Sequence, residues 1–154
     1  MSTNKYNYFK MKTFEVLSKE DQMEFLKFPA YVSLLAANQD GITDRQEMKT
    51  AIDFDYMKTY TCNPMLAGFY EKAARVFKDN LNQLDGELPK GKADRNAEIM
   101  AQLGKLENML SKFDSVYAAI MRQSMKSFRE HVSNAHQNFL ESFILPVPID
   151  GIID

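Results

Sequence analysis

The sequence predicts an all-α fold, a compact single-domain bundle of about six to seven helices. Apolar residues recur at spacings of three and four over most of its length, as on the buried face of an amphipathic helix. Its six glycines and five prolines fall almost entirely between these periodic segments, where they separate helices. Outside the C-terminal tail, no run of five or more residues alternates between apolar and polar like a strand.

Composition limits the class of protein before any motif is considered. With 154 residues, 45% of them hydrophobic, the chain suits one domain with a sizeable core. A net charge of −2 gives no reason to expect specific nucleic-acid binding. The one cysteine, Cys62, excludes an internal disulfide and suits the reducing cytoplasm. The sequence has no signal peptide and no apolar run of about 18 residues, so we expect a cytoplasmic protein without a membrane span.

The first elements follow from caps and prolines. Residues 1–17 form a polar N-terminal lead, and the helical domain spans residues 18–145. Ser18 is the predicted N-cap of the first helix, with Asp21 placed in its first turn. Pro29 interrupts the apolar run that follows, and proline is tolerated in a first turn. The pattern therefore predicts two short helices in place of one.

The middle of the chain carries two further helix starts. Residues 38–41 read as a turn, after which Thr43 and Gln46 form a capping box for a helix to about Tyr60. The pair Asn63-Pro64 repeats the signal, since asparagine caps helices and proline favours their first position.

The helix that begins at Pro64 has one wide apolar face and should end at Asp85-Gly86. An exposed connector follows it, and the segment 85–92 is the one plausible domain seam.

The last 60 residues contain few helix breakers, but their apolar stripe shifts by one residue near Ile120. Two helices joined around residues 112–115 fit this shift better than one rod. Two prolines then stop the last helix, leaving residues 146–154 as an extended apolar tail.

Three carboxylates gather around an Asp-Gly turn. Asp40 precedes the turn, and Asp44 and Glu47 lie three residues apart on the helix that follows. Their oxygens could hold a divalent cation, Ca²⁺ or Mg²⁺. An EF-hand is excluded because its first ligand position would be Ala36. The same residues also suit a helix cap that needs no metal, so both interpretations stay open.

At the end of an apolar helix, an alanine, an Asp-Gly pair, a small capping residue and a glutamate follow one another, at Ala37, Asp40, Gly41, Thr43 and Glu47. This pattern resembles the repeats of the TerB-like tellurite-resistance family, over residues 34–47 only. Ile42 follows the glycine directly, whereas the family usually has one residue between the glycine and this aliphatic residue. The resemblance implies a compact all-α domain linked to tellurite or stress resistance. It also implies metal-binding acidic residues and no established catalytic activity.

A second candidate site is a basic stripe on the last helix. At 100° per residue, five side chains lie within an arc of about 80°: Arg122, Lys126, Arg129, Ser133 and His136. Such a stripe could bind an unidentified protein partner or a small anionic ligand such as a phosphate compound. The simpler interpretation is that these polar side chains only face the solvent and bind nothing.

The remaining reactive side chains give no catalytic pattern. His131 and His136 are the only histidines, and at five residues apart they point in different directions and cannot chelate one ion together. We expect His131 to be a hydrogen-bonded interface residue. Cys62 has no nearby base, and a nucleophilic thiol needs one.

These observations lead to three hypotheses, none of them an enzyme. The first is a non-catalytic TerB-like domain with a divalent cation at the Asp-Gly loop. The second is a protein- or phospholigand-interaction module that uses the basic stripe. The third makes the segment 145–153 a clasp that packs on a second subunit of a homodimer. The chain carries no glycine-rich phosphate loop, nucleophile elbow or catalytic carboxylate pair.

Overall fold

The all-α prediction is confirmed. The computed structural model describes residues 11–40 and 63–144, with side chains up to Asn38 in the first range and up to Asn134 in the second. The described residues form five α-helices and two short 3₁₀ helices, fewer than the six to seven helices predicted for the whole chain. In chain order they are η1 (Phe14–Val16), α2 (Lys19–Phe25), α3 (Phe28–Asp40), α6 (Pro64–Glu87), α7 (Lys92–Asn108), η2 (Met109–Lys112) and α8 (Ser115–Ile144).

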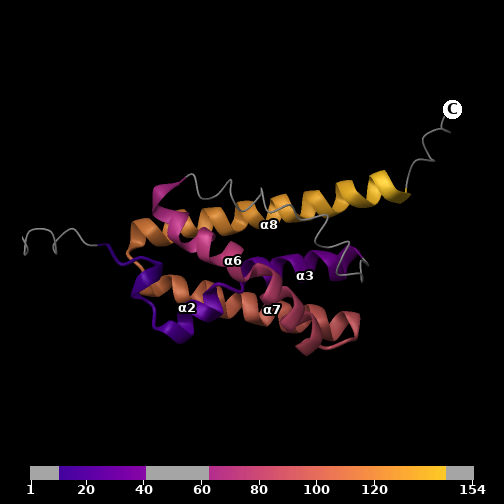
Figure 1. Ribbon diagram of the computed structural model, residues 1–154, viewed down its shortest axis with the longest axis horizontal. Coiled ribbons are helices and arrows are strands. Elements are labelled where there is room, and N and C mark those ends of the chain that lie inside the picture. Colours follow the sequence, from indigo (N-terminus) through magenta and orange to yellow (C-terminus); the bar gives the residue numbers. More distant parts are fainter. Residues whose placement is uncertain (1–10, 41–62, 145–154) are drawn as a thin grey trace, which may run out of the picture.

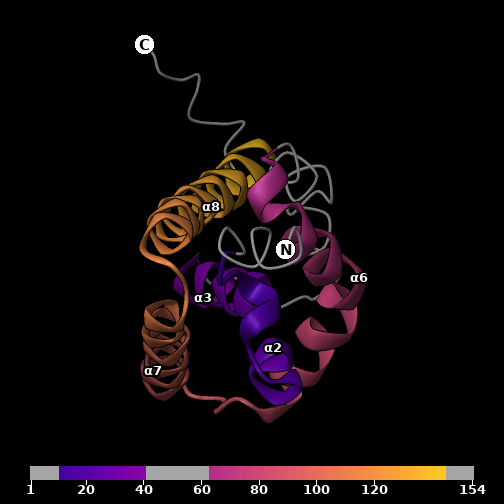
Figure 2. The same ribbon diagram turned by 90° about the vertical axis from the view of Figure 1, so that its left-hand side faces the viewer.

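Helix α3 lies at the centre of the bundle. It contacts α6, α7 and α8, and Figure 2 shows these three helices around it. Every residue from Phe28 to Ala37 is buried. A helix that is apolar on all sides is one that is covered on all sides. Apart from the phenol of Tyr31, the one polar side chain of this segment is Ser33, whose hydroxyl donates to the Pro29 carbonyl.

Helices α7 and α8 run in opposite directions beside α3 and are joined at one end by η2 (Figure 1). The predicted break at residues 112–115 is therefore confirmed.

Asp114 connects the junction between η2 and α8 to the N-terminal segment. Its carboxylate accepts a hydrogen bond from the Lys12 backbone N–H at 2.7 Å, and its own N–H donates to the Lys12 carbonyl at 3.0 Å.

Two predicted helix starts are confirmed by their caps. The Ser18 hydroxyl accepts from the Asp21 N–H at 3.1 Å. The Asn63 side-chain oxygen accepts from the Met65 N–H at 2.9 Å, with proline at the first helical position. Pro29 lies in the first turn of α3, so the two short helices are also confirmed.

One predicted helix end is wrong and a second is confirmed to within one residue, and in both places a tertiary contact takes up a polar side chain. Helix α3 continues through residues 38–40, where the Asn38 side chain donates to the Lys92 carbonyl of α7 at 3.0 Å. Helix α6 continues past Gly86 to Glu87, and Asp85 binds Arg95 in a salt bridge of 2.5 Å. Leu88, expected in an exposed connector, is buried with 7% of its surface exposed.

The core is one continuous cluster of buried apolar side chains drawn from all the described helices. Phe14 and Leu17, which belong to the predicted N-terminal lead, are part of it. Phe69 lies where η1, α2 and α6 meet, with its ring centroid 5.5 Å from that of Phe14 and 5.1 Å from that of Phe25. The hydroxyls of Tyr70 and Ser124 form a buried hydrogen bond of 2.7 Å between α6 and α8.

Candidate functional site

The basic stripe predicted on the last helix lies on α8. Arg122 and Lys126 are exposed and Arg129 is half-buried. These three side chains border a cavity of about 360 Å³ where α3, α7 and α8 meet. The side chain of His136, the fourth residue predicted for this site, lies outside the described residues.

Apolar side chains form the floor of this cavity and charged ones form its edges. Phe28 of α3, Leu103 of α7 and Met125 of α8 are all buried and line it. The edges also carry two carboxylates, Glu107 of α7 and Glu130 of α8. A concave apolar surface with a few charged groups at its margin is the usual form of a ligand site.

A second cavity, of about 220 Å³, continues the first along α8. The two share Arg129 and Glu130, and the second is otherwise lined by Val32, Leu35, Ala36 and Ser133. Together they make one elongated depression between α3 and α8, which we call the α3–α8 groove. From Arg122 to Ser133 it follows about 16 Å of helix at 1.5 Å per residue.

The cations along the groove form no salt bridge with other described residues. Within the described part of the chain, the salt bridges join Lys27 to Glu24, Arg95 to Asp85 and Lys112 to Asp21. None of them involves the cations or carboxylates that line the groove. Three cations and two carboxylates leave a local excess of positive charge, so the groove can attract an anionic group over an apolar floor.

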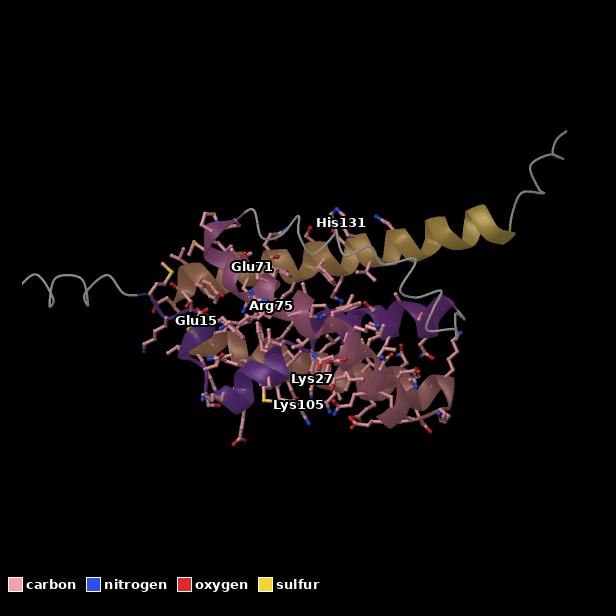
Figure 3. All side chains as sticks on the ribbon, viewed as in Figure 1. Glu15, Lys27, Glu71, Arg75, Lys105 and His131 are labelled. Atoms are coloured by element: carbon pink, nitrogen blue, oxygen red, sulfur yellow. The ribbon has the colours of Figure 1, made fainter. Side chains whose placement is uncertain are left out.

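His131 lies outside this groove, on the outer side of α8 (Figure 3). It is exposed, and its Nδ1 is 2.9 Å from the Ser127 carbonyl one turn earlier. The tautomer that carries a proton on Nδ1 donates to this carbonyl. The predicted hydrogen bond of His131 is therefore confirmed, within its own helix, and its place at an interface stays a prediction.

The predicted cation site cannot be placed on this fold. The side chain of Asp40, at the end of α3, and the whole of Asp44 and Glu47 lie outside the described residues. The helix predicted to begin after Thr43 lies outside them as well. Among the described residues, no three His, Cys, Asp or Glu side chains are grouped in a way that could hold a metal ion.

Metal binding at the Asp-Gly loop stays a prediction with a direct test. If Asp40, Asp44 and Glu47 bind a cation, Ca²⁺ or Mg²⁺ at 100 times its dissociation constant should stabilise the protein by about 2.7 kcal/mol. For a chain of this size, the melting temperature would rise by roughly 5–11 °C. Thermal unfolding in EDTA and then in Ca²⁺, Mg²⁺, Mn²⁺ or Zn²⁺ measures this. The double variant Asp40→Asn/Glu47→Gln should show no rise, and an equal rise in that variant would contradict the prediction.

The stripe was found from the sequence, but the groove was not. Its opposite wall comes from Phe28, Val32 and Leu35 of α3 and Leu103 of α7, which the sequence marks only as apolar. The one signal that could have helped is the continuous apolar run of α3, because such a helix must lie beneath others.

Among the described residues, no helix is long and apolar enough to cross a membrane. A scan of family models, a search of curated proteins and a search of solved structures each give no match for this chain.

Proposed function

We propose that this protein is a non-catalytic interaction module that binds an acidic, partly apolar segment of a protein partner in the α3–α8 groove. One observation carries the proposal. The cations of α8, which form no salt bridge with other described residues, lie directly beside an elongated apolar floor. A solvated helix face needs no such floor, so the combination favours binding.

The dimensions of the groove fit a peptide segment. About 16 Å is the length of roughly five residues in extended conformation. Apolar side chains of the segment would lie against the aliphatic stems of the arginine and lysine side chains, because the floor residues Phe28 and Met125 are only 1% and 3% exposed. Carboxylates of the segment would meet Arg122, Lys126 and Arg129. Arginine is well suited to this because its planar guanidinium can bind a carboxylate through two hydrogen bonds.

Glu107 and Glu130 make a nucleic acid a poorer partner. A phosphate backbone carries closely spaced negative charges, and two carboxylates along the groove would repel it. A peptide can place its acidic residues opposite the cations and leave neutral residues opposite the carboxylates. Repulsion between like charges lowers the affinity for unsuitable partners, so the two carboxylates contribute to specificity.

Reversing the exposed charges of the groove should weaken binding. The probe is a fluorescein-labelled peptide of ten alternating Asp and Leu residues, and anisotropy measures its affinity. We expect Arg122→Glu/Lys126→Glu to raise the dissociation constant at least tenfold, which corresponds to about 1.4 kcal/mol. Each exposed ion pair contributes up to about 1 kcal/mol, and reversal also adds repulsion. Binding should weaken further as salt increases.

The matched control is Lys78→Glu/Lys105→Glu, which makes the same change in net charge at exposed positions of α6 and α7. It should retain affinity for the peptide within about twofold, since distant exposed charges are screened. Equal loss in both variants would show a general effect of net charge and contradict the proposal. A peptide with Lys in place of Asp should not bind.

The TerB-like, metal-binding interpretation is a separate proposal. It rests on residues 34–47 of the sequence, and the metal titration described above tests it without reference to the groove. We place either function in the cytoplasm, since a single cysteine suits a reducing compartment.

A further inference from the structure

Helix α7 has an exposed face that carries no charged side chain. The helix forms one corner of the bundle (Figure 2), and its buried residues belong to the hydrophobic core. On its outer side, five exposed residues fall within an arc of about 100°, at 100° per residue: Ala93, Ala97, Met100, Ala101 and Gly104. We call this surface the α7 outer face. Met100, near its middle, keeps 44% of its surface exposed, and none of the five belongs to the described core.

The charges at the two edges of the α7 outer face are opposite in sign within each edge. Asp94 and Lys105 lie on one edge, and Lys92 and Glu107 lie on the other. All four side chains are exposed, and none takes part in a salt bridge among the described residues. At 1.5 Å per residue, the two charges of an edge are about 16 Å and 22 Å apart along the axis, too far to pair within one helix.

A second copy of the same helix matches these charges. In an antiparallel pair of α7 helices related by a two-fold axis, each edge lies against the same edge of the other copy, in reverse order. If the axis passes between Met100 and Ala101, Asp94 comes within about 3 Å, measured along the helix, of Lys105 of the second copy. Lys92 comes equally close to Glu107 of the second copy. Symmetry repeats both pairs, so four pairs of opposite charge border the face.

The uncharged residues fit the same register. Met100 faces Ala101 of the second copy and Ala97 faces Gly104, so the large side chain lies opposite a small one. A Cβ atom added at Gly104 would meet no other atom within 4 Å, so packing inside the described chain does not require a glycine there. Glycine is unfavourable inside a helix, but it allows another backbone to approach closely. Antiparallel helices also place opposite ends of their dipoles together.

We infer that the α7 outer face joins two copies of this chain in a two-fold symmetric dimer with antiparallel α7 helices. The occupant of the face is therefore a second copy of the protein, selected by the charges at its edges. This dimer does not rest on the proposed function, because Arg122, Lys126 and Arg129 of the α3–α8 groove take no part in it.

Exchange of two charges tests the register. Sedimentation equilibrium of the full chain, at micromolar to millimolar concentration, measures the dissociation constant of the dimer. Asp94→Lys and Lys105→Asp should each raise it at least tenfold, because symmetry turns two attractive pairs into repulsive ones. The double variant Asp94→Lys/Lys105→Asp restores opposite charges and should return it to within about threefold of the unchanged protein. The matched control Asp79→Lys, at an exposed position of α6, should leave it unchanged.

Gly104→Gln separates loss of the dimer from loss of folding. Glutamine favours a helix more than glycine does, and its side chain has open space in the single chain. The melting temperature at low protein concentration should therefore not fall. In the dimer the same side chain prevents close approach of the two helices and should raise the dissociation constant at least tenfold.

Three results would overturn the inference. The first is a chain that stays monomeric up to millimolar concentration. The second is a dimer whose dissociation constant Gly104→Gln leaves unchanged. The third is a dimer that Gly104→Gln weakens but that the double variant Asp94→Lys/Lys105→Asp does not restore, because a parallel pair would place Asp94 beside Lys92 of the second copy.

Discussion

Replacing Phe69 with alanine is expected to lower the free energy of unfolding by about 3–5 kcal/mol, the usual cost of removing a buried aromatic ring. Only 1% of the surface of Phe69 is exposed. Its ring is in contact distance of three others, with centroids 5.5 Å from Phe14, 5.1 Å from Phe25 and 4.8 Å from Tyr70. The expected loss of stability comes both from the apolar surface that the ring buries and from these aromatic contacts.

The effect should be large because Phe69 packs against Phe14 and Phe25, which anchor the two N-terminal elements. Phe14 and Phe25 belong to the short segments η1 and α2, and helices of this length are unstable without tertiary packing. A cavity at Phe69 removes one of the surfaces that both pack on. Close-packed interiors relax only partly around such a cavity, so its cost remains.

Guanidinium-induced unfolding followed by circular dichroism measures this change. Phe69→Leu should lose less than Phe69→Ala, since leucine fills part of the cavity. Val116→Ala is the control at an exposed apolar position, where 57% of the surface is accessible, and it should change stability by no more than about 0.5 kcal/mol. A loss below 1 kcal/mol in Phe69→Ala would contradict the packing described above.

Raising the pH above 10 is expected to destabilise the protein through two buried tyrosines. Burial raises the pKa of Tyr31 from 10.0 to about 12, with a smaller contribution from the negative charges of Glu24 and Glu98. Burial likewise raises the pKa of Tyr117 to about 12. Their exposed fractions are 4% and 1%, so neither phenolate can form in the folded state without desolvation.

The direction follows from proton linkage. Between pH 10 and 12, the unfolded chain releases these two phenolic protons while the folded chain keeps them, so stability falls as pH rises. The stabilisation is fully present below pH 10 and is lost by pH 12. At about 1.4 kcal/mol per pKa unit, each tyrosine accounts for about 2–3 kcal/mol over this interval.

Denaturant unfolding at pH 9 and pH 11.5 tests this prediction, with Tyr31→Phe and Tyr117→Phe as controls. Each variant should show a smaller loss between the two pH values than the unchanged protein. Absorbance at 295 nm should show these two tyrosines ionising later than the others in the folded protein. If all seven tyrosines ionise together near pH 10 while the protein remains folded, the prediction is wrong.

Much of the helical structure could be predicted because its signals are local. The caps at Ser18 and Asn63 act within three residues of the helix they begin, and the break near residues 112–115 is marked by a shift in apolar spacing. Such interactions depend on neighbours in sequence, which a single sequence contains.

The errors lie where a distant part of the chain decided the outcome. Asn38 occurs in a sequence that favours a turn, yet it lies in helix α3. The Asn38 side chain binds the carbonyl of Lys92, 54 residues away. The conformational preference of a single residue amounts to about 1 kcal/mol or less, and the free energy of a tertiary contact can outweigh it.

The sequence by itself determined the all-α class, most of the helix starts and the basic stripe on one side of α8, because periodicity and capping are properties of adjacent residues. Only the tertiary structure decided that α3 lies at the centre and that its side chains form an apolar floor beside Arg122, Lys126 and Arg129. A groove is made by residues from several helices, and their relative positions depend on how the whole core packs. For that reason the sequence supplied the charges of the candidate site, whereas the fold supplied its shape.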